Sequence, residues 1–211
     1  MTITDRDQED YLTTVDDFYD QPMPDDCLPT CIKNILSEYS DRKGVPEIDY
    51  SLSTINNICD YQRGVGTKTN VAGPRMADRL EQHGYTIKYA IRVEMSELEG
   101  ILENADASYP IVELDPNYFD EIEGMDFRKG RDGTYFSHTV IIFKMNSNRV
   151  LYYDPFSAIM ERSSKVEEAK RELSVTKFYE LWNGRHMSRW TLWAEERPSQ
   201  QARLGELGGE D

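Results

Sequence analysis

Hydrophobic residues between positions 27 and 39 recur at the spacing of one face of an α-helix. The apolar positions are Leu28, Cys31, Ile32, Ile35, Leu36 and Tyr39. At 100° per residue their side chains form a single stripe. Asp25 or Asp26 is a suitable N-cap, and Pro29 is tolerated in a first turn because its missing N–H would be unpaired there anyway. The pattern predicts an amphipathic helix that begins close to Cys27 and ends at 44–46.

The rest of the chain shows further helical and strand-like patterns. Short or capped helical patterns predict helices over 53–61, 70–82, 96–104 and within 165–183. Ser96 is the expected cap of the third of these, with Glu99 in capping-box spacing. Alternating or continuous apolar runs predict strands over 85–91, 110–114, 138–145, 150–154 and 189–194. Helices come first and a mostly antiparallel sheet follows, which is typical of the α+β class.

Charge is unevenly distributed along the 211 residues, which carry 39 acidic and 24 basic side chains and a net charge of −15. The first 20 residues contain seven acids and one base, and residues 195–211 contain five acids and two arginines. These polar ends predict flexible acidic extensions over 1–14 and 196–211, around one domain over 15–195. A long polar segment over 115–136 predicts a functional or disordered loop.

The composition also excludes several classes of protein. An acidic chain lacks the clustered cations that bind nucleic acid. The longest apolar run, 140–143, is far too short to span a membrane, and the N-terminus lacks the order of a signal peptide. We therefore expect a cytoplasmic protein that binds neither nucleic acid nor membranes. Nine lysines against fifteen arginines, with the acid excess, are compatible with adaptation to high salt.

Three cysteines are an odd number for a disulfide framework, so at least one thiol should be free. Cys27 lies in the first turn of the predicted helix, where the macrodipole and unpaired N–H groups stabilise a thiolate. Cys31, one turn later, is closer to the centre of the apolar stripe. Buried packing thiols are the alternative interpretation of both residues. Cys27 is the candidate nucleophile.

A nucleophilic thiol needs a base, and the chain contains three histidines. His138 opens a strongly predicted strand, whereas His83 fits a helix end and His186 a solvated turn. In a hairpin over 138–154, Asp154 would lie nearly opposite His138 and could fix its tautomer. A packed core histidine and an Asp-Pro turn are the structural alternatives. Gln21, on the segment before the helix, could donate to an oxyanion.

These residues occur in the order found in the papain-like cysteine peptidases. More narrowly, the chain resembles the family that processes double-glycine bacteriocin leaders, including its stand-alone relatives. The segments that carry the resemblance are QPMPDDCLPTCIKNIL (21–36), GTKTNVAGPRMADRLEQHGY (66–85), SELEGILENADASYPIVEL (96–114), SHTVIIFKMNSNRVLYYDPF (137–156) and FYELW (178–182). The resemblance implies a papain-like fold with Cys27 as nucleophile, His138 as base, Asp154 as orienting residue and Gln21 as oxyanion donor. Leu28 stands where members of that family often have glycine.

The expected function is therefore that of a cysteine peptidase, a thiol hydrolase that cleaves peptide or protein substrates through a Cys-His-Asp triad. Two alternatives remain open: an acyltransferase of the transglutaminase or arylamine N-acetyltransferase kind, and a papain-like module that binds peptides or proteins with an idle triad. No cofactor or metal is expected, because no cluster of His, Cys and carboxylates has ligand spacing. The sequence leaves the oligomeric state open.

Overall fold

The computed structural model describes residues 18–23, 25–44, 50–81, 85–115, 117, 137–156, 171–184 and 189–196. Outside these ranges lie the predicted extension over 1–14, residues 197–211 of the extension predicted over 196–211, His83, His186 and nearly all of the predicted 115–136 loop. The boundaries predicted for the single domain stay predictions. Within the described ranges, none of the helices combines the length and apolar character needed to cross a bilayer.

Three helices in the first part of the chain confirm the predicted helical patterns. They are α2 (Cys27–Lys43), α3 (Leu52–Ile58) and α4 (Thr69–Leu80). Helix α2 begins at Cys27, as predicted, and ends at Gly44, whose φ of 63° is the left-handed conformation that glycine adopts most readily. Helix α3 is capped by the Ser51 hydroxyl, which accepts from the Thr54 N–H at 3.2 Å.

Six strands form one sheet, and two further helices accompany it. The strands are β1 (Tyr85–Ala90), β2 (Ile111–Leu114), β3 (His138–Met145), β4 (Arg149–Tyr153), β5 (Arg171–Ser174) and β6 (Thr191–Glu196). Their spatial order is β1-β6-β2-β3-β4-β5, and every neighbouring pair is antiparallel. Helices α5 (Met95–Glu103) and α7 (Val175–Trp182) lie between strands in the chain. The α+β prediction is confirmed.

Two of the predicted elements were wrong in detail. The N-cap residue of helix α5 is Glu94 rather than Ser96, and the Glu97 side chain, not that of Glu99, accepts from the N-cap backbone N–H, at 2.6 Å. The capping box therefore begins two residues earlier, and a carboxylate replaces the expected hydroxyl. Residues 171–174 form the edge strand β5, inside the region 165–183 where helices were predicted. Pairing with β4 overrides the helix-forming preference of this short segment.

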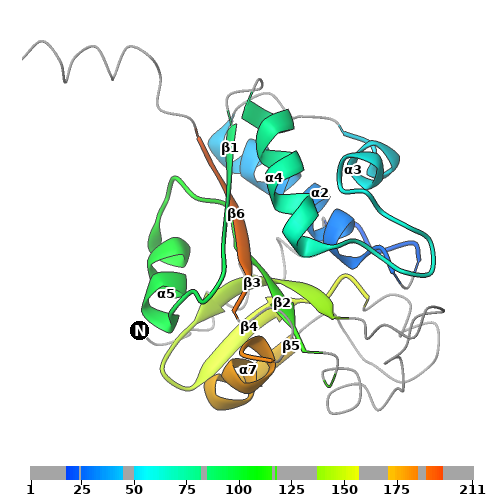
Figure 1. Ribbon diagram of the computed structural model, residues 1–211. Coiled ribbons are helices and arrows are strands. Elements are labelled where there is room, and N and C mark those ends of the chain that lie inside the picture. The colour runs from blue at the N-terminus through cyan, green and yellow to red at the C-terminus, as the bar shows by residue number, and fades with distance from the viewer. Residues whose placement is uncertain are drawn as a thin grey trace, which may run out of the picture.

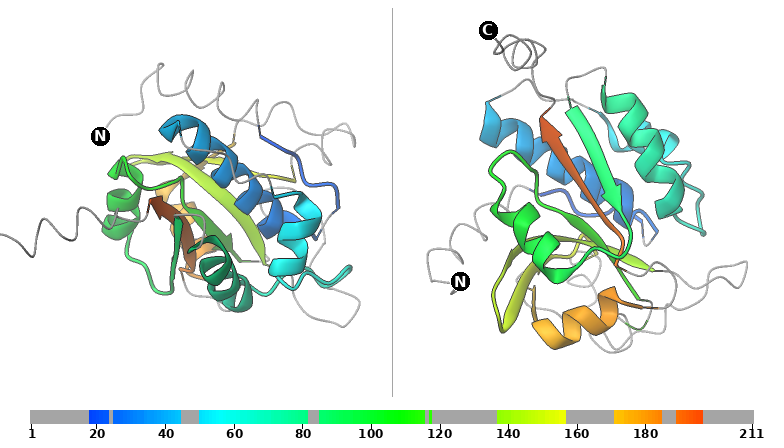
Figure 2. Two further views of the ribbon diagram at one scale, coloured as in Figure 1. Left: turned by 90° about the horizontal axis from the view of Figure 1, so that it is seen from above. Right: turned by 60° about the vertical axis from the view of Figure 1, so that its left-hand side comes forward.

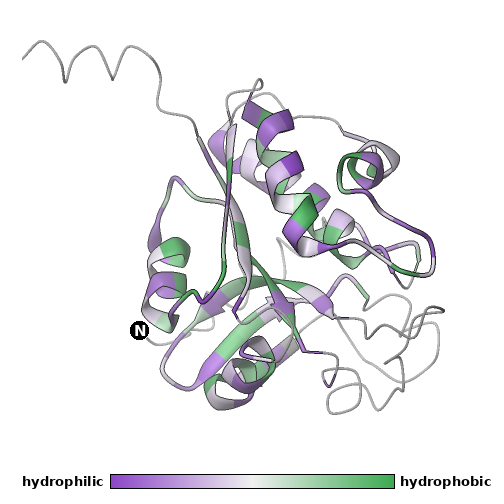
Figure 3. Cartoon of the chain, viewed as in Figure 1, coloured by the Kyte–Doolittle hydropathy of each residue, from purple (hydrophilic) through white to green (hydrophobic). Residues whose placement is uncertain are grey.

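The sheet separates two groups of helices (Figure 1). Helices α2, α3 and α4 pack together on one face, with α2 along β3 and α4 against β1, as Figure 2 also shows. Helices α5 and α7 cover the other face. Each face has its own hydrophobic core, one that includes Ile32 and Ile141 and one that includes Ile142 and Trp182. Figure 3 shows the mixture of hydrophilic and hydrophobic residues expected of helices packed on one side only.

Helix α4 approaches β1 so closely that Gly73 has no room for a side chain. A Cβ at Gly73 would lie 2.8 Å from Cγ of Tyr89. We expect Gly73→Ala to lower the free energy of unfolding by about 1–2 kcal/mol, because overpacking outweighs the gain in helix propensity. Gly100→Ala is the matched control, since a Cβ in the middle of α5 would meet nothing within 4 Å. Chemical denaturation should show a stabilised control, and equal effects of both changes would contradict this packing.

Candidate active site

The N-terminus of α2 lies beside the start of β3, and this position brings three of the predicted residues together. Cys27 is the first residue of α2, and His138 is the first residue of β3. Asp154 follows the last residue of β4 directly. The sequence thus places a thiol, an imidazole and a carboxylate at the ends of three elements, where side chains can meet without interrupting the packing of the sheet.

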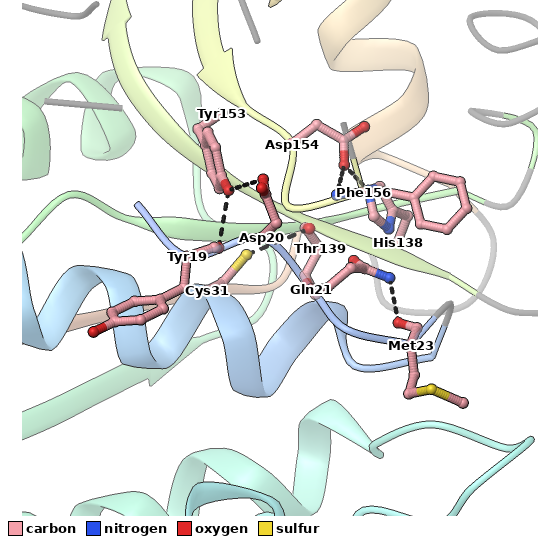
Figure 4. Close-up of polar contacts among 10 residues, drawn as sticks. All are labelled: Tyr19, Asp20, Gln21, Met23, Cys31, His138, Thr139, Tyr153, Asp154 and Phe156. Atoms are coloured by element: carbon pink, nitrogen blue, oxygen red, sulfur yellow. Dashed lines mark hydrogen bonds and ion pairs between the residues drawn. The ribbon is translucent and has the colours of Figure 1, made fainter. Parts of the chain in front are cut away.

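His138 and Asp154 form a short, buried contact. Nε2 of His138 lies 2.6 Å from Oδ1 of Asp154, and the two side chains are 1% and 0% exposed. Strand pairing places Ile141 opposite Tyr153, so Asp154 reaches His138 diagonally rather than from the directly opposed position. The Phe156 N–H donates to the same carboxylate oxygen at 2.8 Å and helps to hold it in place (Figure 4).

The Cys27 thiol is hydrogen-bonded to the imidazole of His138. Since Nε2 faces Asp154, this leaves Nδ1 for the sulfur. Burial acts to raise the pKa of Cys27, but the bond to His138 and its positive charge outweigh burial and lower that pKa, with help from Thr139. Cys27 is partly exposed, whereas Cys31 and Cys59 are buried.

His138 responds in the opposite direction. Its burial disfavours the charged imidazolium, yet the Asp154 carboxylate and the Cys27 thiolate together raise the pKa of His138 to about 10. The lowered pKa of Cys27 and the raised pKa of His138 both favour the thiolate–imidazolium form of the pair over the neutral form. This form is a ready nucleophile beside a ready proton donor.

Cys31, on α2, and Cys59 are buried in the hydrophobic core on the α2 side of the sheet, and all three cysteines are free thiols. Burial raises the pKa of Cys31 well above its ordinary value, and it raises that of Cys59 to about 12. The Cys31 thiol donates to the Thr139 carbonyl at 3.5 Å. The interpretation of Cys31 as a core residue is thus confirmed, and among the three thiols only Cys27 has a lowered pKa.

Gln21 lies on the segment that leads into α2 and is fixed close to the carboxylate side of the site. Its backbone N–H donates to the Pro155 carbonyl at 2.9 Å, one residue beyond Asp154. The side chain is 2% exposed, and its Nε2 donates to the Met23 carbonyl at 2.7 Å (Figure 4). Since a carbonyl only accepts, this bond fixes which way the amide points, and it leaves a second N–H on Nε2.

Two features of the site were missed in the sequence. Asp25 accepts hydrogen bonds from the Tyr61 hydroxyl at 3.0 Å and from the Gly64 N–H, and so ties the turn before Cys27 to the loop 61–66. Gly64 and Gly66 have φ values of 81° and 83°, which explains the glycines in this loop. Asp26, the N-cap residue, makes no side-chain cap bond, and Asn56 donates to its carboxylate at 3.4 Å.

The second missed feature is a buried carboxylate on β2. Glu113 is paired in register with Thr139 and accepts hydrogen bonds from Thr69 at 2.9 Å and from the Ser137 hydroxyl. It therefore connects the residue before His138 to the start of α4. The sequence feature that could have revealed this carboxylate is a charged residue inside the apolar run IVEL (111–114). Among the described residues, no group of three or more His, Cys, Asp or Glu is arranged to hold a metal ion.

The fold belongs to the α+β, papain-like architecture. A solved structure that shares it is that of a Bacillus anthracis protein designated a C39-like peptidase, with a TM-score of 0.58 over 89% of this chain and 98% of that one. The two sequences are 12% identical, so the likeness concerns the fold. No protein-family model and no curated protein match the sequence.

Proposed function

We propose that this protein is a cysteine peptidase that hydrolyses peptide bonds through Cys27, His138 and Asp154, with Gln21 as an oxyanion donor. The observation that carries the proposal is the chain of contacts from the half-buried thiol to His138 and from His138 to Asp154 at 2.6 Å. A packing thiol has no need of a buried imidazole–carboxylate pair. The shared fold with a designated C39-like peptidase supports the same reaction class.

In the proposed reaction, the Cys27 thiolate attacks the carbonyl carbon of the scissile bond and forms a tetrahedral intermediate. The proton on Nδ1 of His138 passes to the leaving amine as the carbon–nitrogen bond breaks. Water then attacks the thioester carbonyl carbon and gives a proton to His138. The carbon–sulfur bond breaks, which releases the acid product and restores the Cys27 thiolate. Asp154 holds the imidazole orientation through both steps and stabilises its charged form.

Gln21 supplies the proposed stabilisation of the oxyanion. Its buried side chain has one Nε2 hydrogen engaged with Met23. In the proposed role the second Nε2 hydrogen and the N–H of Cys27 donate to the negative oxygen. Removing one donor of this kind costs about 10²–10³ in kcat. We expect Gln21→Ala to show that loss with KM nearly unchanged. Gln21→Glu, which keeps the size but presents an acceptor, should lose as much, and an active Gln21→Glu would exclude this role.

A thiol-directed activity probe tests the proposal. An electrophilic peptide probe should label Cys27 in the native protein, and peptide mapping should find the label there rather than on Cys31 or Cys59. His138→Ala should abolish labelling at neutral pH, because the thiolate loses its counter-charge. Equal labelling with and without the imidazole would overturn the proposal. Addition of an amine acceptor distinguishes hydrolysis from acyl transfer, because a transferase would yield an amide product.

A further inference from the structure

A second thiol lies one helical turn from the proposed nucleophile, and the peptidase mechanism does not use it. Cys31 is fully buried in the core beside α2, four residues after Cys27 on the same helix. Its thiol donates to the Thr139 carbonyl at 3.5 Å, and Thr139 also contacts the Cys27 thiol. The two sulfurs therefore approach the same residue of β3 from the same face of α2.

The backbone separation of the two residues is compatible with a disulfide. Residues four apart in an α-helix have Cα atoms about 6.2 Å apart, within the usual 4.4–6.8 Å range. The Cβ atoms of such a pair are about 5–6 Å apart, whereas a disulfide needs roughly 3.5–4.5 Å. The two Cβ atoms must therefore approach each other by about 1–2 Å, which requires a shift of the first turn of α2.

The first turn of helix α2 has no side-chain cap bond that would oppose this shift. Cys27 is its first residue, and the N-cap residue Asp26 makes no side-chain bond to the helix end. The Asp26 carboxylate instead accepts from Asn56, at 3.4 Å. Within the turn, backbone bonds such as that from the Thr30 N–H to the Asp26 carbonyl, at 3.0 Å, hold the helix, while Asp25 before it is bonded to the loop 61–66. A one-turn adjustment at a helix end leaves the packing of later turns in place.

We propose that Cys27 and Cys31 form a reversible intramolecular disulfide when a peroxide oxidises the protein. In the first step the Cys27 thiolate attacks a peroxide oxygen, the O–O bond breaks, and sulfenic acid and hydroxide form when the peroxide is hydrogen peroxide. In the second step the Cys31 sulfur attacks the Cys27 sulfur, the S–O bond breaks, and the Cys31 proton leaves with the hydroxyl as water. Both thiols are oxidised and the peroxide is reduced.

The two thiols are suited to different parts of this reaction. Cys27 is half-buried and has a lowered pKa, so peroxide reaches a thiolate there first. Cys31 is buried and its pKa is raised, so oxidants in the solvent do not react with it directly. The sulfenic acid formed at Cys27 is then the oxidised group with which Cys31 reacts. The disulfide would block the nucleophile and protect it from irreversible oxidation until a thiol reductant restores it.

Mass spectrometry of peroxide-treated protein tests the inference. Native protein treated with hydrogen peroxide should become about 2 Da lighter, with a Cys27–Cys31 link in the non-reduced peptide map, and dithiothreitol should restore both free thiols. Cys31→Ala should instead gain about 32 or 48 Da at Cys27, which dithiothreitol does not remove. Cys59→Ala, the matched control at another core thiol, should behave like the native protein.

Several results would overturn the inference. They are irreversible oxidation of Cys27 in the native protein, a link to Cys59, a disulfide between two molecules, and unchanged thiols. The inference rests on the thiolate character of Cys27 in the proposed function but not on any substrate. Probe labelling of Cys27 separates failure of this inference from failure of the proposed function. If untreated native protein and untreated Cys31→Ala are both labelled but peroxide forms no disulfide in the native protein, only this inference is refuted. If Cys27 of the untreated native protein is not labelled, the proposed function is refuted. Thermal unfolding shows whether Cys31→Ala is folded.

Discussion

Replacing Cys27 by serine should reduce peptide hydrolysis to the background rate, a loss of roughly 10⁵–10⁶ in kcat/KM. The native thiolate is stabilised by its bond to His138, whereas a serine hydroxyl remains protonated at neutral pH in the same place. The measurement is the rate of product formation from a cleaved peptide, followed by liquid chromatography and mass spectrometry.

The matched control for this change is Cys59→Ser. It makes the same chemical substitution in the core at the end of α3, where the thiol has a raised pKa. We expect it to lower stability while retaining most of the activity, because it removes no group that contacts the substrate. A Cys27→Ser enzyme that retains one tenth or more of the native rate would contradict the assignment of the nucleophile, by the scale of losses known for such residues.

Asp154→Asn is expected to have the second largest effect, a fall of about 10⁴ in kcat. The carboxylate accepts from Nε2 of His138 at 2.6 Å and is a principal cause of the raised pKa of that residue. An asparagine of the same size neither balances the imidazolium charge nor fixes the tautomer in the same way. Kinetics on a peptide substrate should show the loss mainly in kcat, and a native kcat would exclude the orienting role.

The same change should lower stability in a pH-dependent manner. A histidine whose pKa is raised to about 10 in the folded state stabilises the protein fully below its unfolded value of about 6.5, and this stabilisation is lost as the pH rises through about 10. Breaking a buried pair costs about 3–5 kcal/mol. The difference in unfolding free energy between native and Asp154→Asn proteins should be largest near neutrality and should shrink in alkali. A difference that grows in alkali would contradict the ion pair.

The sequence predicted the elements that carry the site because each has a strong local signal. The apolar stripe after Cys27 defines α2, and the run from His138 defines β3. The Asn-Ser-Asn turn then brings β4 back alongside β3, with Asp154 at its end. These signals extend over a turn or a strand, so their positions could be predicted to within a residue or two.

Features that depend on contacts between distant segments could not be predicted in this way. Glu113 is buried because Thr69 and Ser137, 44 and 24 residues away in the chain, donate to it. Asp25 bonds to Gly64, 39 residues later. Strand β5 is a strand because it pairs with β4, and its four residues carry no strong pattern of their own. Contacts between distant parts of the chain determine these features, and the local pattern of hydrophobic residues does not predict such contacts.

The central claim is that His138 converts Cys27 into a thiolate near neutral pH, and the pH dependence of Cys27 alkylation tests it most directly. The rate of reaction with iodoacetamide, read at Cys27 by peptide mapping, follows the fraction of thiolate. In the native protein the apparent pKa of Cys27 should lie below the ordinary thiol value, and in His138→Ala it should rise because only the Thr139 hydrogen bonds then oppose burial. Identical titration curves in the two proteins would contradict the account.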